Sequence, residues 1–329
     1  MVAKSIATLT DVTTREQFLE LRQRGIGSSE IAAVAGLSRF KNPIAVYYDK
    51  VSDIDEELEK VEEEENEFMY WGKKLEGVVA DEFAERNPDI EVVDTDEVFQ
   101  LVGLEWMLAS PDRFLLCPKR GQGILEIKTT SAYNAEDWKD GQVPDEYILQ
   151  VQHQMAVTGY AYAYVAVLIG GNKYQQQLVP RDDEIIDQLV NIGQEFWDRV
   201  ITRTPPELDG TAISKALLDV LYPEAAPETT VELPPDEADL LLAEYADAER
   251  REKDAGQEKE AAKNKLKNLM GNAEAGLVNG VPRVTWTNVA TKRLNTDRLK
   301  ELHPEIYQQY LTESRYRRFT VKKVKGGKK

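Results

Sequence analysis

The chain has 329 residues, 42% of them hydrophobic, and 59 acidic against 41 basic residues give it a net charge of −18 at pH 7. This length allows one large domain or two, and without an apolar run of about eighteen residues no membrane span is expected. Cys117 is the single cysteine, which excludes an internal disulfide and a four-cysteine metal centre. The N-terminal residues lack the pattern of a secretory signal, so we expect a cytoplasmic protein.

The negative charge does not exclude nucleic acid as a partner, because it is unevenly distributed. Segment 53–67 holds ten acids and one lysine, whereas residues 314–329 hold eight bases and no acid. An acidic exterior that surrounds a local basic channel remains compatible with DNA binding. We expect the acidic segment to be a solvated loop or the start of a helix.

The N-terminal part of the chain is predicted to be helical. Helices are expected at residues 14–24, 30–35, 42–50 and 68–86. In the last of these, apolar residues recur at the spacing of an amphipathic helix. The first two helices are joined by G-I-G-S-S-E, in which Ser28 or Ser29 can cap the second helix and Gly36 can end it.

The middle of the chain is predicted to alternate between strands and helices. Strands are expected at residues 90–94, 97–103, 105–109, 112–117, 123–129, 161–169 and 173–179, and helices at 144–158 and 181–202. The turn Gly170-Gly171-Asn172 joins the last two strands as a hairpin. The fold class is therefore α/β, with a mixed central sheet flanked by helices over about residues 14–203.

The C-terminal part is expected to form an extension. Its elements are a short helix at 213–221, a linker at 223–235, a long helix at 236–270, a hairpin at 275–289, a helix near 296–311 and a basic strand at 315–324. The hairpin prediction depends on the turn signal Asn279-Gly280. The long helix has a wide polar face, which favours a packing arm over a core helix. We therefore expect two domains, residues 1–210 and residues 211–329.

Two acids and a lysine form the strongest candidate site. Asp112 follows Ser110-Pro111, and Glu126-Ile127-Lys128 lies on the next predicted strand of a hairpin. Because side chains alternate along a strand, Glu126 and Lys128 project to the same face while Ile127 enters the core. Two carboxylates beside one amine can hold a hard divalent cation and steady an anion, which is the chemistry of phosphodiester cleavage.

Further groups can complete this site. Glu76 lies on the predicted helix 68–86, and packing of that helix across the sheet end would add a third carboxylate. Mg²⁺ retains several waters, so these carboxylates and a backbone carbonyl, that of Ile127, would suffice as protein ligands. Lys128 would position or deprotonate a water, or stabilise the phosphorane oxygens.

Other residues have simpler interpretations. The Gly-Ser turn at Ser28 and Ser29 could bind a phosphate at a helix N-terminus, but helix capping explains it equally well. His153 is expected to be structural. Trp71 and Trp106 are expected to lie in the core.

Several motifs occur together in one order along residues 20–200: G-I-G-S-S-E, W-G-K-K-L-E, P-D followed after thirteen residues by E-I-K, and Y-I-L-Q-V-Q-H-Q-M. In this the chain resembles the YqaJ-type viral recombinase nucleases, relatives of phage lambda exonuclease within the PD-(D/E)XK superfamily. The resemblance implies a PD-(D/E)XK core and 5′→3′ digestion of one strand of duplex DNA. It also implies Mg²⁺, with Mn²⁺ able to substitute, and a ring-shaped homo-oligomer, with a trimer favoured.

The resemblance also assigns roles to particular residues. Asp112, Glu126 and Lys128 match the catalytic set, and Glu76 matches a helix carboxylate near the metal. A pocket for the 5′-phosphate is implied at Arg22 or Arg24, Ser28, Ser29, Ser110 and Gln150. The expected partners are double-stranded DNA ends and a single-strand annealing protein, in a host cytoplasm if the chain is encoded by a phage.

Three functions are compatible with these residues. The first is a Mg²⁺-dependent 5′→3′ exonuclease that produces 3′ overhangs for recombination by strand annealing. The second is an endonuclease that uses the same site, and cleavage of closed circular DNA would distinguish it. The third is a non-catalytic DNA-binding or assembly module, which would have no need of Asp112, Glu126 and Lys128 together.

Overall fold

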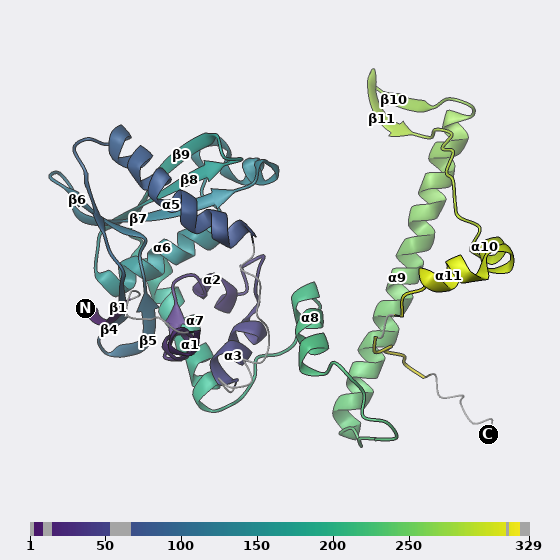
Figure 1. Cartoon of the computed structure of the whole chain (residues 1–329), viewed down its shortest axis with the longest axis horizontal. Coiled ribbons are helices and arrows are strands. Elements are labelled where there is room, and N and C mark those ends of the chain that lie inside the picture. The colour runs from purple at the N-terminus through teal and green to yellow at the C-terminus, as the bar shows by residue number, and fades with distance from the viewer. Residues whose placement is uncertain (1–2, 9–14, 53–66, 314–315, 323–329) are drawn as a thin grey trace. The chain divides into compact units, whose positions relative to one another are not determined.

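The computed structural model describes residues 3–8, 15–52, 67–313 and 316–322. They form two compact units, residues 1–221 and residues 222–329 (Figure 1). The expected domain boundary after residue 210 stays a prediction. Helix α8 (Ala212–Leu221) falls in the first unit, where Ser214 is held to Asn42 by a 2.8 Å hydrogen bond.

A five-stranded mixed sheet forms the centre of the first unit. Its order is β3-β6-β7-β8-β9, and only β7 and β8 run parallel to each other. The strands are β3 (Glu91–Asp94), β6 (Arg113–Cys117), β7 (Gly121–Thr130), β8 (Tyr162–Ile169) and β9 (Lys173–Pro180). The predicted fold class, a mixed sheet flanked by helices, is confirmed.

Helices cover both faces of this sheet (Figure 1). On one face, α5 (Glu67–Arg86) buries Val79 and Phe83 against Leu125 and Ile127 of β7. On the other face, α6 (Asp145–Thr158) and the 3₁₀ helix η2 (Ala132–Gly141) pack on Ile124 and β8. Because side chains alternate along β7, Glu126 and Lys128 face the α6 side.

A second sheet lies beside the first, in the order β1-β4-β5-β2. Its strands are β1 (Ala3–Thr8), β2 (Ile26–Gly27), β4 (Glu97–Leu101) and β5 (Leu104–Ala109). Helices α1 (Arg15–Gln23), α2 (Ile31–Val34), α3 (Pro43–Val51) and α7 (Asp183–Ile201) complete this region. At Gly25 a Cβ would lie 2.4 Å from the carbonyl oxygen of Trp106, so this close approach of β2 to β5 requires glycine.

The second unit contains a long helix and smaller elements. These are α9 (Pro235–Met270), the hairpin β10 (Ala275–Val278) and β11 (Val281–Thr285), α10 (Thr296–Leu302) and α11 (Pro304–Gln309). Asn279 and Gly280 both have positive φ, of 51° and 79°, which confirms the predicted turn. None of the helices within the described ranges is both long and apolar enough to cross a bilayer.

Some predicted elements differ from the structure. The helix near 296–311 is divided at His303, because Pro304 cannot continue the hydrogen bonding of α10. The basic strand at 315–324 is wrong for the described residues 316–322, which have no strand partner. Residues 53–66 of the acidic segment lie outside the described ranges. Trp71 is 54% exposed instead of buried, whereas Trp106 is in the core as predicted.

Candidate active site

Asp112 and Glu126 are brought together by the pairing of β6 with β7. Arg113, the first residue of β6, is paired with Leu125, so Asp112 lies beside Glu126 at the strand end. The Asp112 carboxylate accepts a 2.7 Å hydrogen bond from the backbone N–H of Ile127. The predicted hairpin geometry is therefore confirmed, and the sheet backbone itself orients this aspartate.

Glu126 is buried, with 1% of its surface exposed, and is surrounded by donors. Lys128 Nζ and Gln150 Nε2 each donate to Oε1 at 2.6 Å, and Gln154 Nε2 donates to Oε2 at 2.8 Å. Gln150 and Gln154 lie four residues apart, on one side of α6. Gln150 was predicted for this region; Gln154 was missed, although its spacing in Q-V-Q-H-Q was a usable signal.

The charges of this group act on one another. Burial raises the pKa of Asp112 well above its ordinary value, and the nearby Glu126 raises it further. Burial alone would lower the pKa of Lys128, but Glu126 and Asp112 outweigh it and raise that pKa. Two carboxylates thus share a single amine, which leaves the site with an excess of negative charge that a cation would relieve.

The donor set fits a hard divalent cation. Asp112, Glu126 and the carbonyl of Ile127 are oxygen ligands of the kind that Mg²⁺ prefers. Glu76 instead forms a 2.6 Å ion pair with Arg113, although its charge still contributes to the raised pKa of Asp112. Over the described ranges no three His, Cys, Asp or Glu side chains are gathered closely enough to hold a metal, so the expected convergence of three carboxylates is not found there.

A cavity of about 580 Å³ opens beside these residues. Most of the residues predicted for catalysis or phosphate binding line it: Asp112, Glu126, Lys128, Gln150, Ser110, Arg22, Ser28 and Ser29. Arg24, the alternative to Arg22, is exposed and is not part of this lining. The structure therefore joins the two predicted sites into one cavity.

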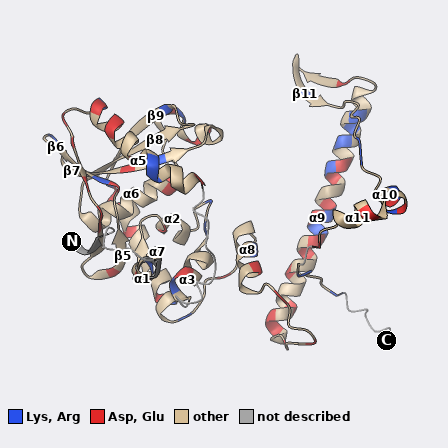
Figure 2. Cartoon of the chain, in the orientation of Figure 1, with Lys and Arg blue, Asp and Glu red and all other residues tan. Residues whose placement is uncertain are grey.

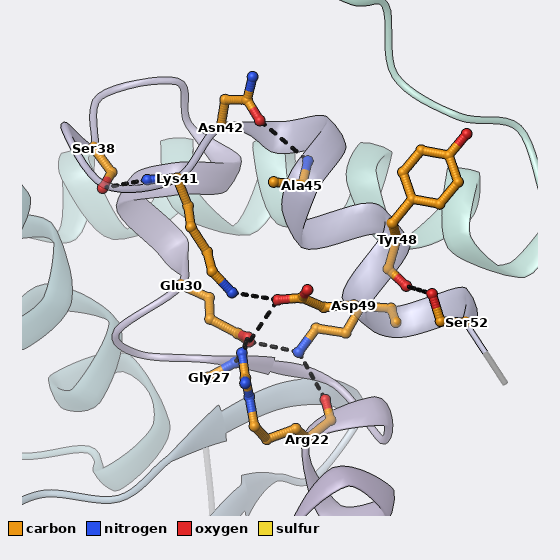
Figure 3. Close-up of polar contacts among 11 residues, drawn as sticks. Arg22, Gly27, Glu30, Ser38, Lys41, Asn42, Ala45, Tyr48, Asp49 and Ser52 are labelled. Atoms are coloured by element: carbon orange, nitrogen blue, oxygen red, sulfur yellow. Dashed lines mark hydrogen bonds and ion pairs between the residues drawn. The ribbon is translucent and has the colours of Figure 1, made fainter. Parts of the chain in front are cut away.

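The wall formed by Arg22 is a network of ion pairs (Figure 3). Arg22 contacts Glu30 at 2.5 Å and Asp49 at 3.4 Å, and Lys41 also pairs with Asp49. Buried Lys50 contacts Glu30 at 2.6 Å and donates a 2.7 Å hydrogen bond to the carbonyl of Arg22. Three bases surround two acids, so this network, of which Arg22 and Glu30 line the cavity, has one positive charge in excess.

The excess of positive charge in this network lowers the pKa of Glu30. Burial would raise the pKa of Glu30, but attraction to Lys50 and Arg22 outweighs it and lowers the pKa to about 2. The sequence offered no signal for Glu30, Asp49 and Lys50 as a group, because Glu30 precedes α2 whereas Asp49 and Lys50 lie on α3.

Ser28 and Ser29 do not cap the following helix. Its N-cap residue is Glu30, which makes no side-chain capping bond; its Oε2 instead accepts from the N–H of Gly27 at 3.0 Å. The helix has four residues, Ile31–Val34, and so provides only a short dipole for a phosphate. Capping by these serines is therefore wrong, and both serines line the cavity instead.

His153 has a structural position, as predicted. It is fully buried, with Nε2 3.1 Å from the carbonyl oxygen of Leu108 on β5. Burial lowers its pKa to about 4, so the imidazole is neutral at physiological pH. Its contact ties α6 to the second sheet.

Known proteins resemble this chain over most of its length. The model of the YqaJ-like viral recombinase domain matches residues 17–161. The uncharacterized protein YqaJ of Bacillus subtilis (strain 168) is 34% identical over 314 residues, which cover 94% of this chain and 95% of that protein.

Solved structures are more distantly similar. The alkaline exonuclease LHK-Exo of Laribacter hongkongensis is 20% identical to this chain. The match covers 57% of this chain and 94% of the LHK-Exo chain, with a TM-score of 0.45. A phage-related exonuclease of Haemophilus somnus 129PT is 15% identical to this chain. The match covers 56% of this chain and 99% of the exonuclease chain, with a TM-score of 0.38.

Proposed function

Because the chain belongs to the YqaJ-like viral recombinase family, we propose that it is a metal-dependent deoxyribonuclease that digests linear duplex DNA from its ends. One observation carries the proposal: Asp112, Glu126 and Lys128 share a cavity with Arg22. The first three suit phosphodiester hydrolysis, and a guanidinium suits a phosphate. A single cavity can thus hold both a scissile bond and a terminal phosphate.

The residues of the chain have distinct tasks in this mechanism. Asp112, Glu126 and the Ile127 carbonyl would hold Mg²⁺, which would neutralise charge on the phosphoryl group and lower the pKa of a bound water. Gln150 and Gln154 fix the Glu126 carboxylate through both of its oxygens. Lys128 Nζ places a positive charge where a phosphoryl oxygen becomes more negative during attack.

We further propose 5′→3′ polarity, Mg²⁺ or Mn²⁺ as cofactor, a ring-shaped oligomer and cooperation with a single-strand annealing protein in the cytoplasm. Arg22, Ser28, Ser29 and Ser110 would bind the 5′-phosphate, and the product would be a 3′ overhang. A guanidinium already oriented by Glu30 loses little freedom when it binds a phosphate, which supports a specific end pocket.

The test compares a linear duplex carrying 5′-phosphates with the same DNA as a closed circle. The exonuclease should release nucleotides from the 5′ ends of the linear DNA, should leave the circle intact, and should stop when EDTA is added. Cleavage of the circle would identify an endonuclease. DNA binding without hydrolysis in either metal would identify a non-catalytic module.

A further inference from the structure

Helix α9 carries an apolar seam that the described residues of its own unit leave mostly exposed. None of its 36 residues is buried within the described part of the chain. Ten positions at alternating spacings of three and four follow the heptad pattern of a coiled coil, and eight of them hold Ala, Leu or Tyr, while Glu252 and Lys259 hold the other two. The ten seam positions are Ala238, Leu241, Tyr245, Ala248, Glu252, Ala255, Lys259, Ala262, Leu266 and Leu269.

The seam is long and exposed. Leu241, Leu266 and Leu269 are 56%, 45% and 82% exposed. Residues 238–269 span 32 positions, more than four heptads and about 48 Å at 1.5 Å per residue. Coiled coils need three to four heptads, so this length is sufficient. Within the unit, Phe319 borders the seam with its ring centroid 6.2 Å from that of Tyr245.

The two halves of α9 carry opposite charge (Figure 2). Residues 235–252 contain seven acids and two bases, a net charge of −5, and residues 253–270 contain three acids and five bases, a net charge of +2. A second α9 in antiparallel orientation would place each acidic half against a basic half. A parallel partner would place the two acidic halves together and would repel.

We infer that α9 pairs with the α9 helix of a second copy of this chain as an antiparallel coiled coil. One register pairs all ten seam positions, and in it the numbers of facing residues add up to 507. Leu241 then faces Leu266 of the partner subunit, and Tyr245 faces Ala262 of the partner subunit. Large residues thus face small or matching ones in most layers, as close packing requires.

The flanking charges support the same register. Glu244 lies beside Lys265 of the partner subunit, and Arg251 lies beside Glu258 of the partner subunit; symmetry repeats both pairs. In a parallel dimer, Glu252 and Lys259 would each face its own copy inside the seam, which is destabilising. The antiparallel arrangement removes these clashes and adds four attractive pairs.

The first experiment measures the mass of the full-length protein by sedimentation at micromolar concentration. The wild type should contain an even number of chains, which is six if α9 joins two of the expected ring-shaped trimers. Leu266→Asp should halve the mass, whereas the control Leu240→Asp, an exposed leucine outside the seam, should leave it unchanged. A monomeric wild type, an odd-numbered assembly, or equal behaviour of the two variants would overturn the inference.

The second experiment tests the orientation by charge reversal. Glu244→Lys alone should weaken association at least tenfold at low salt, because it faces Lys265 of the partner subunit. Adding Lys265→Glu to the same chain should restore association. A double variant that stays as weak as the single variant would rule out this register, whatever the outcome of the nuclease assays.

Discussion

Asp112 and Glu30 line the same cavity, yet the pKa values of their carboxyl groups are shifted in opposite directions. The pKa of Asp112 is raised by burial and by Glu126, while that of Glu30 is lowered to about 2 by Lys50 and Arg22, which outweigh its burial. The balance of neighbouring charges therefore decides between them. The acid-rich wall is suited to a cation and the base-rich wall to an anion, as a bound metal and a DNA phosphate would require.

The largest effect should come from removing a charge at the acid-rich wall. Glu126→Gln should lower the hydrolysis rate by about 10³-fold or more, about 4 kcal/mol, because it removes the proposed metal ligand and the partner of Lys128. Nucleotide release from linear duplex measures this, with the exposed Glu85→Gln as control. A folded Glu126→Gln enzyme with more than about a tenth of the wild-type rate would exclude Glu126 from the active site.

A substitution in the base-rich wall should lower the stability of the folded protein. Lys50→Met should lower the free energy of unfolding by about 3 kcal/mol, because it leaves the buried Glu30 with one partner fewer. Lys41→Met is the matched control: Lys41 pairs with Asp49 at a more exposed position and should cost less than about 1 kcal/mol. Similar losses in urea denaturation of both variants would contradict a buried pair.

Acid should weaken the same wall. The pKa of Glu30 is lowered from 4.5 to about 2 in the folded state, so its contribution is complete above pH 4.5 and is lost as the pH falls towards 2. The loss amounts to about 3 kcal/mol. Unfolding curves of the wild type and of Glu30→Gln should therefore converge over this pH range. A constant difference between them would show that Glu30 has an ordinary pKa.

The smallest expected effect on the digestion rate distinguishes Arg22 from Arg24 as the residue that binds the 5′-phosphate. Arg22→Gln should slow digestion of 5′-phosphorylated ends about 30-fold, about 2 kcal/mol, and should change little on 5′-hydroxyl ends. Arg24→Gln, outside the cavity lining, should match the wild type on both substrates. The reverse ranking of the two variants would move the phosphate contact to Arg24.

The sequence was most informative where contacts are local or follow from strand pairing. Side-chain alternation and the predicted hairpin placed Asp112 beside Glu126, because register follows from these features. Contacts between distant elements could not be read in this way. Lys50 reaches Glu30 only because α3 packs against α2, whose first turn follows Glu30, and no local pattern encodes that approach.

Misleading predictions had physical causes as well. The apolar spacing of helix α5 included Trp71, but the helix buries only Val79, Ala80 and Phe83, which lie further along it, so Trp71 remains exposed. Ser28 and Ser29 resembled capping residues, but Glu30 takes the cap position and is itself held by Lys50.

The hydrogen bond from Ile127 N–H to Asp112 has an evolutionary consequence. It ties the active site to the alignment of two strands, so one residue inserted or deleted between Gly123 and Glu126 would turn Glu126 towards α5 and bring an apolar side chain into the cavity. The turn at residues 118–120 lies outside this constraint. Related chains should therefore vary in length at that turn and keep a constant spacing within β7.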